Sequence, residues 1–265
     1  MSKIEIISKS DFIISFATIL EENIDIKNAI FEAVKNGSDF VYMHPIDNAN
    51  LKSSYSQFIK YEVGSEEGIC ALLLDALVKN CDENTKNFID NLDLGYISAE
   101  SSAGEEEFEE VYENSLEAKS KTIVIGNDVV EHERIENIIK LLALIKKYSD
   151  FNLVILNEEL ENKINSCEDS DLEDIEDLKS FNGTLVYKLI KEDSDELIAS
   201  QTFVNVAKVK SGDEVYVNFK ENRVKKSIKV DDSLHGTIAI LGVKNCDDIF
   251  SGYRYKQVKI EKVEA

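Results

Sequence analysis

Four cysteines and three histidines are the residues of this chain best suited to binding soft metals or carrying redox chemistry. Thiolates hold iron–sulfur clusters and structural zinc when they are closely spaced, as in C-x-x-C. The cysteines lie far apart in the sequence, at Cys70, Cys81, Cys167 and Cys246. The histidines are equally scattered, at His44, His132 and His235. We therefore predict no metal centre. Cys70 should act as a small hydrophobic residue within an apolar helix, and the histidines should lie at the surface or at the edge of the core.

Motifs for nucleophilic catalysis and nucleotide binding are also missing. No G-x-S-x-G motif occurs, and the turn after the first predicted strand reads Phe16-Ala17-Thr18-Ile19-Leu20, without glycine. Gly64 and Gly68 are placed to bring backbone close to a phosphate, although helix entry and close packing are the interpretation we favour. The sequence thus predicts no catalytic, cofactor-binding or metal-binding residue.

A charge-dense segment, residues 167–177, could be mistaken for a metal-binding loop. It lacks the glycine and the terminal glutamate spacing of an EF-hand. We expect a solvated linker or a short helix.

Hydrophobic periodicity indicates an α/β region in the first part of the chain. Strand patterns at 11–16 and 39–43 flank a helix that carries Ala29 and Ala33 and ends at Asn36-Gly37, which predicts parallel strands. Ser65 is placed to cap a helix containing Ile69 and Leu73, with further helices at 85–91 and 105–118. The unit then repeats, with strands at 121–126 and 151–156 around a helix at 135–145.

From about residue 182 the pattern changes to short strands with tight turns. Five strands are predicted, at 183–190, 214–219, 224–230, 237–241 and 253–260. The one helical piece lies near 203–208. These features are typical of a small β barrel or sandwich.

Composition limits the partners. The 265 residues carry 52 acidic and 30 basic side chains, a formal charge of −22, which repels nucleic acid and anionic membranes. No apolar run reaches the about 20 residues that span a bilayer, and charge interrupts the N-terminus too early for a signal peptide. We expect a cytoplasmic protein with no direct membrane insertion.

Two regions together resemble the molybdopterin oxidoreductase superfamily. Residues 204–217, followed by 226–231 and 235–239, are similar to the sequence motif of its aspartate-decarboxylase-like barrel domain. Residues 61–68 are similar to its P-G-T-D/E segment, with Val63 for proline and Ser65 for threonine, and residues 121–126 with Glu131-His132 are similar to its strand–Gly–helix unit.

Within that superfamily the chain is similar to the C-terminal half of the large iron–sulfur subunit of bacterial NADH-quinone oxidoreductase, respiratory complex I. The segments at 93–98, 182–187 and 200–203 carry this resemblance. It implies a Rossmann-like doubly wound α/β region (1–165), an acidic linker (166–181) and a double-psi β-barrel domain (182–265). It also implies a role without cofactor beside other peripheral-arm subunits, on the cytoplasmic side of the membrane. The iron–sulfur clusters would belong to an N-terminal region of the full subunit outside this chain.

Two alternatives remain open. One is a molybdopterin guanine dinucleotide-binding subunit of a formate-dehydrogenase-like enzyme, favoured by the barrel and the turn at Gly64. The other is an unrelated nucleotide-binding regulator that uses the first β-α-β unit, against which the missing G-x-G-x-x-G counts.

Overall fold

The computed structural model describes residues 1–47, 51–168, 171–191, 194–244 and 250–264. Its contacts divide the chain into two compact units. The first comprises residues 1–45 and 54–180, and the second comprises residues 46–53 and 181–265. Each unit is described by itself.

The first unit is built on a five-stranded parallel sheet in the order β3-β2-β1-β4-β5. Its strands are β1 (Phe12–Phe16), β2 (Asp39–Met43), β3 (Gln57–Ile59), β4 (Lys121–Ile125) and β5 (Phe151–Ile155). β1 pairs in register with β2 on one side and with β4 on the other. The chain therefore adds β2 and β3 on one side of β1, and then adds β4 and β5 on the other side of β1. In sheets of this kind, the crevice at the carboxyl ends of the two central strands is the usual ligand site.

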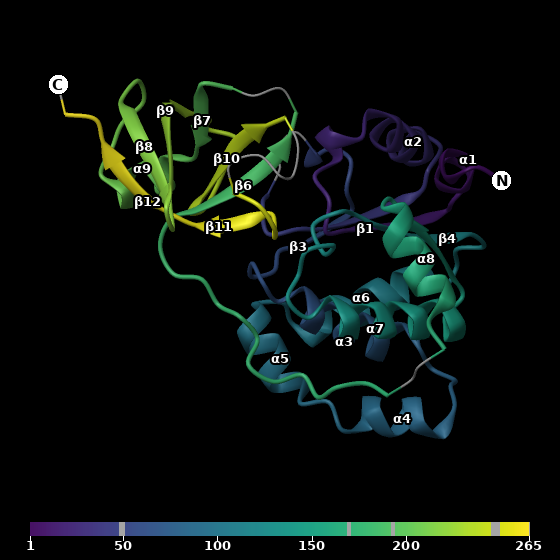
Figure 1. The fold of residues 1–265 in the computed structure, drawn as a ribbon. Helices are drawn as coiled ribbons and strands as arrows, with labels where there is room; N and C mark the ends of the chain where they lie inside the picture. The colour runs from purple at the N-terminus through teal and green to yellow at the C-terminus, as the bar shows by residue number, and fades with distance from the viewer. Residues whose placement is uncertain (48–50, 169–170, 192–193, 245–249, 265) are drawn as a thin grey trace. The chain divides into compact units, whose positions relative to one another are not determined.

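Helices cover both faces of this sheet (Figure 1). On one face lie α1 (Lys3–Ser8) and α2 (Ile24–Lys35), and on the other α3 (Glu66–Leu77), α6 (Glu105–Ser115) and α7 (Ile135–Tyr148). The remaining helices are the 3-10 turn η1 (Leu20–Glu22), α4 (Glu83–Asp90), α5 (Leu94–Ser101) and α8 (Glu158–Ser166). The expected C-cap at Asn36-Gly37 is confirmed, because α2 ends at Lys35 and Gly37 adopts φ +102°.

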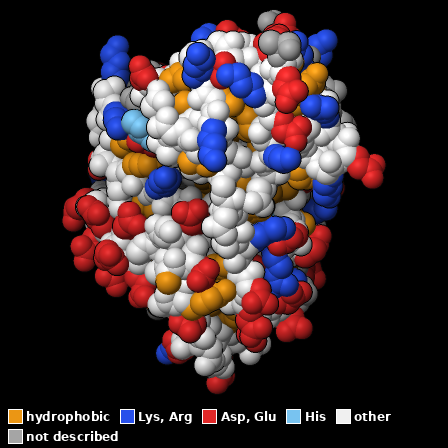
Figure 2. Space-filling view, turned by 90° about the vertical axis from the view of Figure 1, so that its left-hand side faces the viewer, with side chains coloured by type: hydrophobic (Ala, Val, Ile, Leu, Met, Phe, Trp, Pro, Cys, Tyr) orange, Lys and Arg blue, Asp and Glu red, His pale blue; other side chains and the backbone are white. Residues whose placement is uncertain are grey.

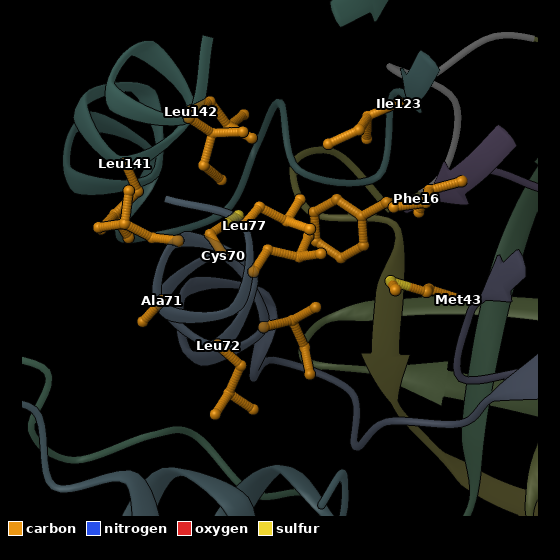
Figure 3. Close-up of a cluster of buried hydrophobic side chains, with 14 of the residues drawn as sticks. Phe16, Met43, Cys70, Ala71, Leu72, Leu77, Ile123, Leu141 and Leu142 are labelled. Atoms are coloured by element: carbon orange, nitrogen blue, oxygen red, sulfur yellow. The ribbon is translucent and has the colours of Figure 1, made fainter. Parts of the chain in front are cut away.

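Helix α3 is the centre of the main hydrophobic core. Figure 3 shows Cys70 and Leu77 of α3 between Phe16 of β1 and the leucines of α7. Because other helices and the sheet surround α3, nearly all of its residues are buried, including those outside the apolar stripe that the sequence predicted. Ser65 occupies the N-cap position, but its hydroxyl donates to the Glu62 carbonyl oxygen (2.6 Å) and makes no capping bond.

In its described part the acidic segment has no helix and exposes its carboxylates, as expected of a solvated linker, but two apolar side chains anchor it. Residues 171–180, which we call the strap, form neither helix nor strand and belong to the first unit. Ile175 and Leu178 are both buried, and Asn137 of α7 bonds both the N–H and the carbonyl of Glu173. Composition did not predict this anchoring, because only every third residue of the segment is apolar and most of the others are charged.

The second unit is a mixed seven-stranded, nearly closed barrel in the order β11-β6-β10-β7-β9-β8-β12. Its elements are β6 (Leu185–Ile190), β7 (Glu196–Ala199), α9 (Gln201–Ala207), β8 (Glu214–Phe219), β9 (Asn222–Val230), β10 (Ile238–Val243), β11 (Tyr255–Gln257) and β12 (Lys259–Lys262). β6 and β10 run parallel, as do β7 and β9, and the other pairs are antiparallel. The predicted class, an α/β region followed by a small β barrel, is confirmed.

Within the described residues, the longest helices are too short or too polar to cross a membrane.

Candidate functional site

The candidate site is the carboxyl edge of the parallel sheet, where the loops after β1 and β4 meet. The backbone N–H of Gly126 donates to the Phe16 carbonyl oxygen (2.9 Å), and that of Asp128 donates to the Ala17 carbonyl oxygen (3.1 Å). A Cβ on Gly126 would lie only 2.1 Å from the Ala17 oxygen. Ala17 itself is buried with φ +56°, a conformation that costs energy for a residue with a side chain. The two loops are therefore in direct backbone contact.

A buried His–Asp pair lies at the same edge. His44 directly follows β2 and Asp128 follows β4, the two strands that flank β1. Their Nε2 and Oδ2 atoms are 3.0 Å apart, and the two side chains are 0% and 1% exposed. Because β1 lies between the two strands, this pair bridges the end of β1. The ring of His44 also stacks on that of Tyr42 at 5.7 Å.

A second buried pair joins the loop after β4 to the start of α3. His132 Nε2 lies 3.1 Å from the Gly64 carbonyl oxygen and 3.3 Å from Glu66 Oε2. Its Nδ1 accepts the backbone N–H of Arg134 (3.1 Å). Burial lowers the pKa of His132, but the hydrogen bond and charge of Glu66 outweigh it, so the net shift is upward from the ordinary value.

Tyr61, between β3 and α3, completes this polar cluster. Its ring packs against Phe16 at 5.7 Å, and its hydroxyl is buried with no hydrogen-bond partner among the described residues. Burial, followed by the nearby carboxylates of Glu66 and Asp128, raises the pKa of Tyr61 well above the ordinary value. The phenol is therefore a neutral side chain across the physiological range.

At this edge the loops are joined to each other by hydrogen bonds and buried polar side chains. A dinucleotide at such an edge needs a glycine-rich turn through which backbone N–H groups approach the phosphates. Here the turn after β1 is buried and hydrogen-bonded to the loop after β4, and Gly126 has no room for even one further carbon atom. The turn after β1 therefore lacks the glycine-rich backbone approach that a dinucleotide uses at such an edge.

The glycines and cysteines considered from the sequence have structural surroundings. A Cβ on Gly68 would lie 2.9 Å from Leu178 of the strap, which confirms the close-packing interpretation, whereas Gly64 adopts φ +91° in the turn before α3. Cys70 is a buried free thiol, as predicted, and burial raises its pKa well above the ordinary value. Cys81 and Cys167 are partly buried, and Cys246 lies outside the described residues.

The histidines depart in part from expectation. His235 is exposed, as predicted, but His44 is fully buried and His132 nearly so, each facing a carboxylate. Neither belongs to a group of three or more metal-binding side chains within the part of the chain that is described. A polar residue directly after an apolar strand, such as His44 after Met43, was the signal in the sequence for this cluster.

The fold has a counterpart among solved structures. Acetylene hydratase from Pelobacter acetylenicus superposes with a TM-score of 0.52 and 6% sequence identity, over 98% of this chain and 78% of that chain. No family model matches this sequence, and no curated protein matches it.

At 6% identity the likeness establishes the fold and does not extend to activity. This chain thus shares its fold, an α/β region with a barrel, with acetylene hydratase.

Proposed function

We propose that this chain is a cofactor-free structural module of the peripheral-arm large subunit of an NADH-quinone oxidoreductase. It would support electron transfer by iron–sulfur clusters that lie outside it. Its partners would be other peripheral-arm subunits on the cytoplasmic side of the membrane.

The observation that carries the proposal is the closed carboxyl edge of the sheet. The Gly126–Phe16 and Asp128–Ala17 backbone bonds and the buried His44–Asp128 pair occupy the place where a dinucleotide would enter. Contacts that close this edge can stabilise the fold without a prosthetic group, as a structural module requires.

The choice of parent complex rests on the sequence motifs together with the fold. The likeness to acetylene hydratase supports the superfamily architecture. The segments at 93–98, 182–187 and 200–203 favour the large iron–sulfur subunit within it. A formate-dehydrogenase-like dinucleotide-binding subunit is the competing assignment, and it requires the carboxyl edge to open.

Two measurements test the proposal. The chain, tagged at its C-terminus and isolated from its native host, should co-purify with peripheral-arm subunits identified by mass spectrometry. The same protein, purified to homogeneity and denatured, should release no pterin or guanine dinucleotide, molybdenum or iron. A stoichiometric dinucleotide would establish the competing assignment, and isolation without any such subunit would overturn the choice of parent complex.

A further inference from the structure

A groove lies on the surface of the first unit, between helices α4 and α5 and the strap. Its volume is about 810 Å³, inside the range of about 300–1,000 Å³ that is usual for ligand sites. Phe88, Leu92 and Tyr96 line it as half-buried side chains, and Ile97 and Ile175 are the buried part of its floor. The groove therefore presents apolar and aromatic surface in a hollow, which is the shape that marks a binding surface.

The rim of the groove is acidic and lacks internal counter-charges. Asp174, Glu176 and Asp177 of the strap are exposed, and the described part of the chain supplies no ion pair to any of them. Asp93 on the opposite side uses one oxygen to accept the Tyr96 N–H (2.9 Å). In Figure 2, acidic side chains gather over the lower part of the face shown, with hydrophobic side chains exposed among them.

The first unit as a whole is negatively charged, like the rim of the groove. Residues 1–45 and 54–180 contain 38 acidic and 15 basic side chains, a formal charge of −23, whereas residues 46–53 and 181–265 contain 14 acidic and 15 basic ones. The unit that carries the groove therefore holds the excess negative charge of the chain. Such a field raises the association rate of a cationic partner.

We propose that this groove binds a basic, partly apolar peptide segment of a partner protein. An arginine guanidinium can pair with the rim carboxylates and stack on the rings of Phe88 or Tyr96, while an aliphatic neighbour packs on Leu92 and Ile97. A single small cation would neutralise one part of the rim only. A segment with several cationic side chains can pair with the carboxylates on both sides of the groove. This inference goes beyond the proposed function and does not depend on the parent complex.

The probe is a fluorescein-labelled octapeptide of alternating arginine and leucine, followed by fluorescence anisotropy with the full chain. An octapeptide of alternating arginine and serine has the same charge without apolar side chains. We expect the arginine–leucine peptide to bind about tenfold more tightly or better, because burial of its apolar side chains adds to the charge attraction. Equal binding of the two peptides would overturn the proposal.

Two triple variants separate the groove from the general charge of the protein. Asp174→Asn/Glu176→Gln/Asp177→Asn removes the rim, and Glu109→Gln/Glu113→Gln/Glu117→Gln removes the same charge from exposed positions on and after α6, outside the groove. We expect the rim variant to weaken binding by about tenfold and the control variant by less than about threefold. Equal losses would identify a long-range charge effect and overturn the proposal.

The apolar floor is tested by Phe88→Ala, whose side chain is half-buried, with the same expected loss of about tenfold. If this variant unfolds, amide chemical-shift mapping on the unmodified protein decides. Shifts confined to α4, α5 and the strap support the groove, and shifts elsewhere overturn it.

Discussion

His44 and Asp128 face each other across the end of β1, with 3.0 Å between Nε2 and Oδ2 and with both side chains buried. They come from the loops after β2 and β4, so the pair joins the two halves of the sheet at its carboxyl edge. Removal of one member of such a pair leaves the other buried without it, which is costly.

The first prediction concerns this pair. His44→Leu should lower the free energy of unfolding by about 3 kcal/mol or more, measured by urea denaturation. The double variant His44→Leu/Asp128→Leu should lose less than the sum of the two single variants, because it leaves no buried carboxylate without its partner. Additive losses in this cycle would show that the two side chains do not interact.

The second prediction tests the contact between the loops after β1 and β4. Gly126→Ala places a carbon atom 2.1 Å from the Ala17 oxygen and 2.2 Å from Thr18 Cβ. The loops must then separate, and we expect a loss of about 3 kcal/mol in the free energy of unfolding. Gly95→Ala is the matched control, because its nearest neighbour is 3.6 Å away and alanine favours the helix by up to about 1 kcal/mol. If both variants unfold at the same urea concentration as the unmodified chain, the loop contact is absent in solution.

The third prediction distinguishes a structural from a ligand-binding role for Tyr61. Tyr61→Phe removes a buried hydroxyl that has no hydrogen-bond partner among the described residues. The free energy of unfolding should therefore stay unchanged or rise by up to about 1 kcal/mol. Tyr96→Phe is the control, since the Tyr96 hydroxyl accepts the Leu178 N–H at 3.0 Å, and it should lose about 1 kcal/mol. A marked loss of stability in Tyr61→Phe would reveal a bound group at this hydroxyl.

The fourth prediction is a pH dependence from His132. Its pKa in the folded chain is raised above the ordinary value, so its protonated form is favoured by folding. The stabilisation is complete below the unfolded-state pKa and is lost as the pH rises through the folded-state pKa. His132→Gln should therefore cost more stability at about pH 5.5 than at about pH 9. Urea denaturation of both proteins at the two values measures the difference, and an equal cost at both would contradict the assignment.

Continuous apolar runs made most of the first sheet predictable. β1, β2, β4 and β5 lie within one residue of the predicted strands, because each is rich in apolar residues, most of which are buried. β3 was missed because it has only three residues, and α1 and α8 because two or three apolar residues mark each of them. α5 was also missed. It begins with Leu94-Gly95, and a glycine at the start of a helix weakens the helical pattern.

The barrel was predicted with fewer strands than it has. β7 has only four residues and was missed, and the strand expected at 253–260 is divided into β11 and β12. β11 pairs with β6 and β12 with β8, so the one predicted strand serves two different neighbours. A division of this kind depends on distant strands, which a local pattern does not contain.

Local reasoning could mark single polar residues after strands but could not show that they meet, because they come from distant segments. His44 and Asp128 are 84 positions apart, and His132 and Gly64 are 68 positions apart. Only the strand order places the residues after β2 and β4 at one edge, and that order follows from the tertiary fold. The sequence motifs correctly indicated α/β architecture but could not reveal which polar residues the loops bring together.

The strap determines where this polypeptide can be divided for expression. Leu178 packs against Gly68, and Asn137 holds both backbone groups of Glu173, so the strap seals the outer side of α3 although it follows the last helix of its unit. A truncation after Ser166 would uncover apolar surface on α3 and invite aggregation. The shortest practical α/β fragment therefore extends through Ser180.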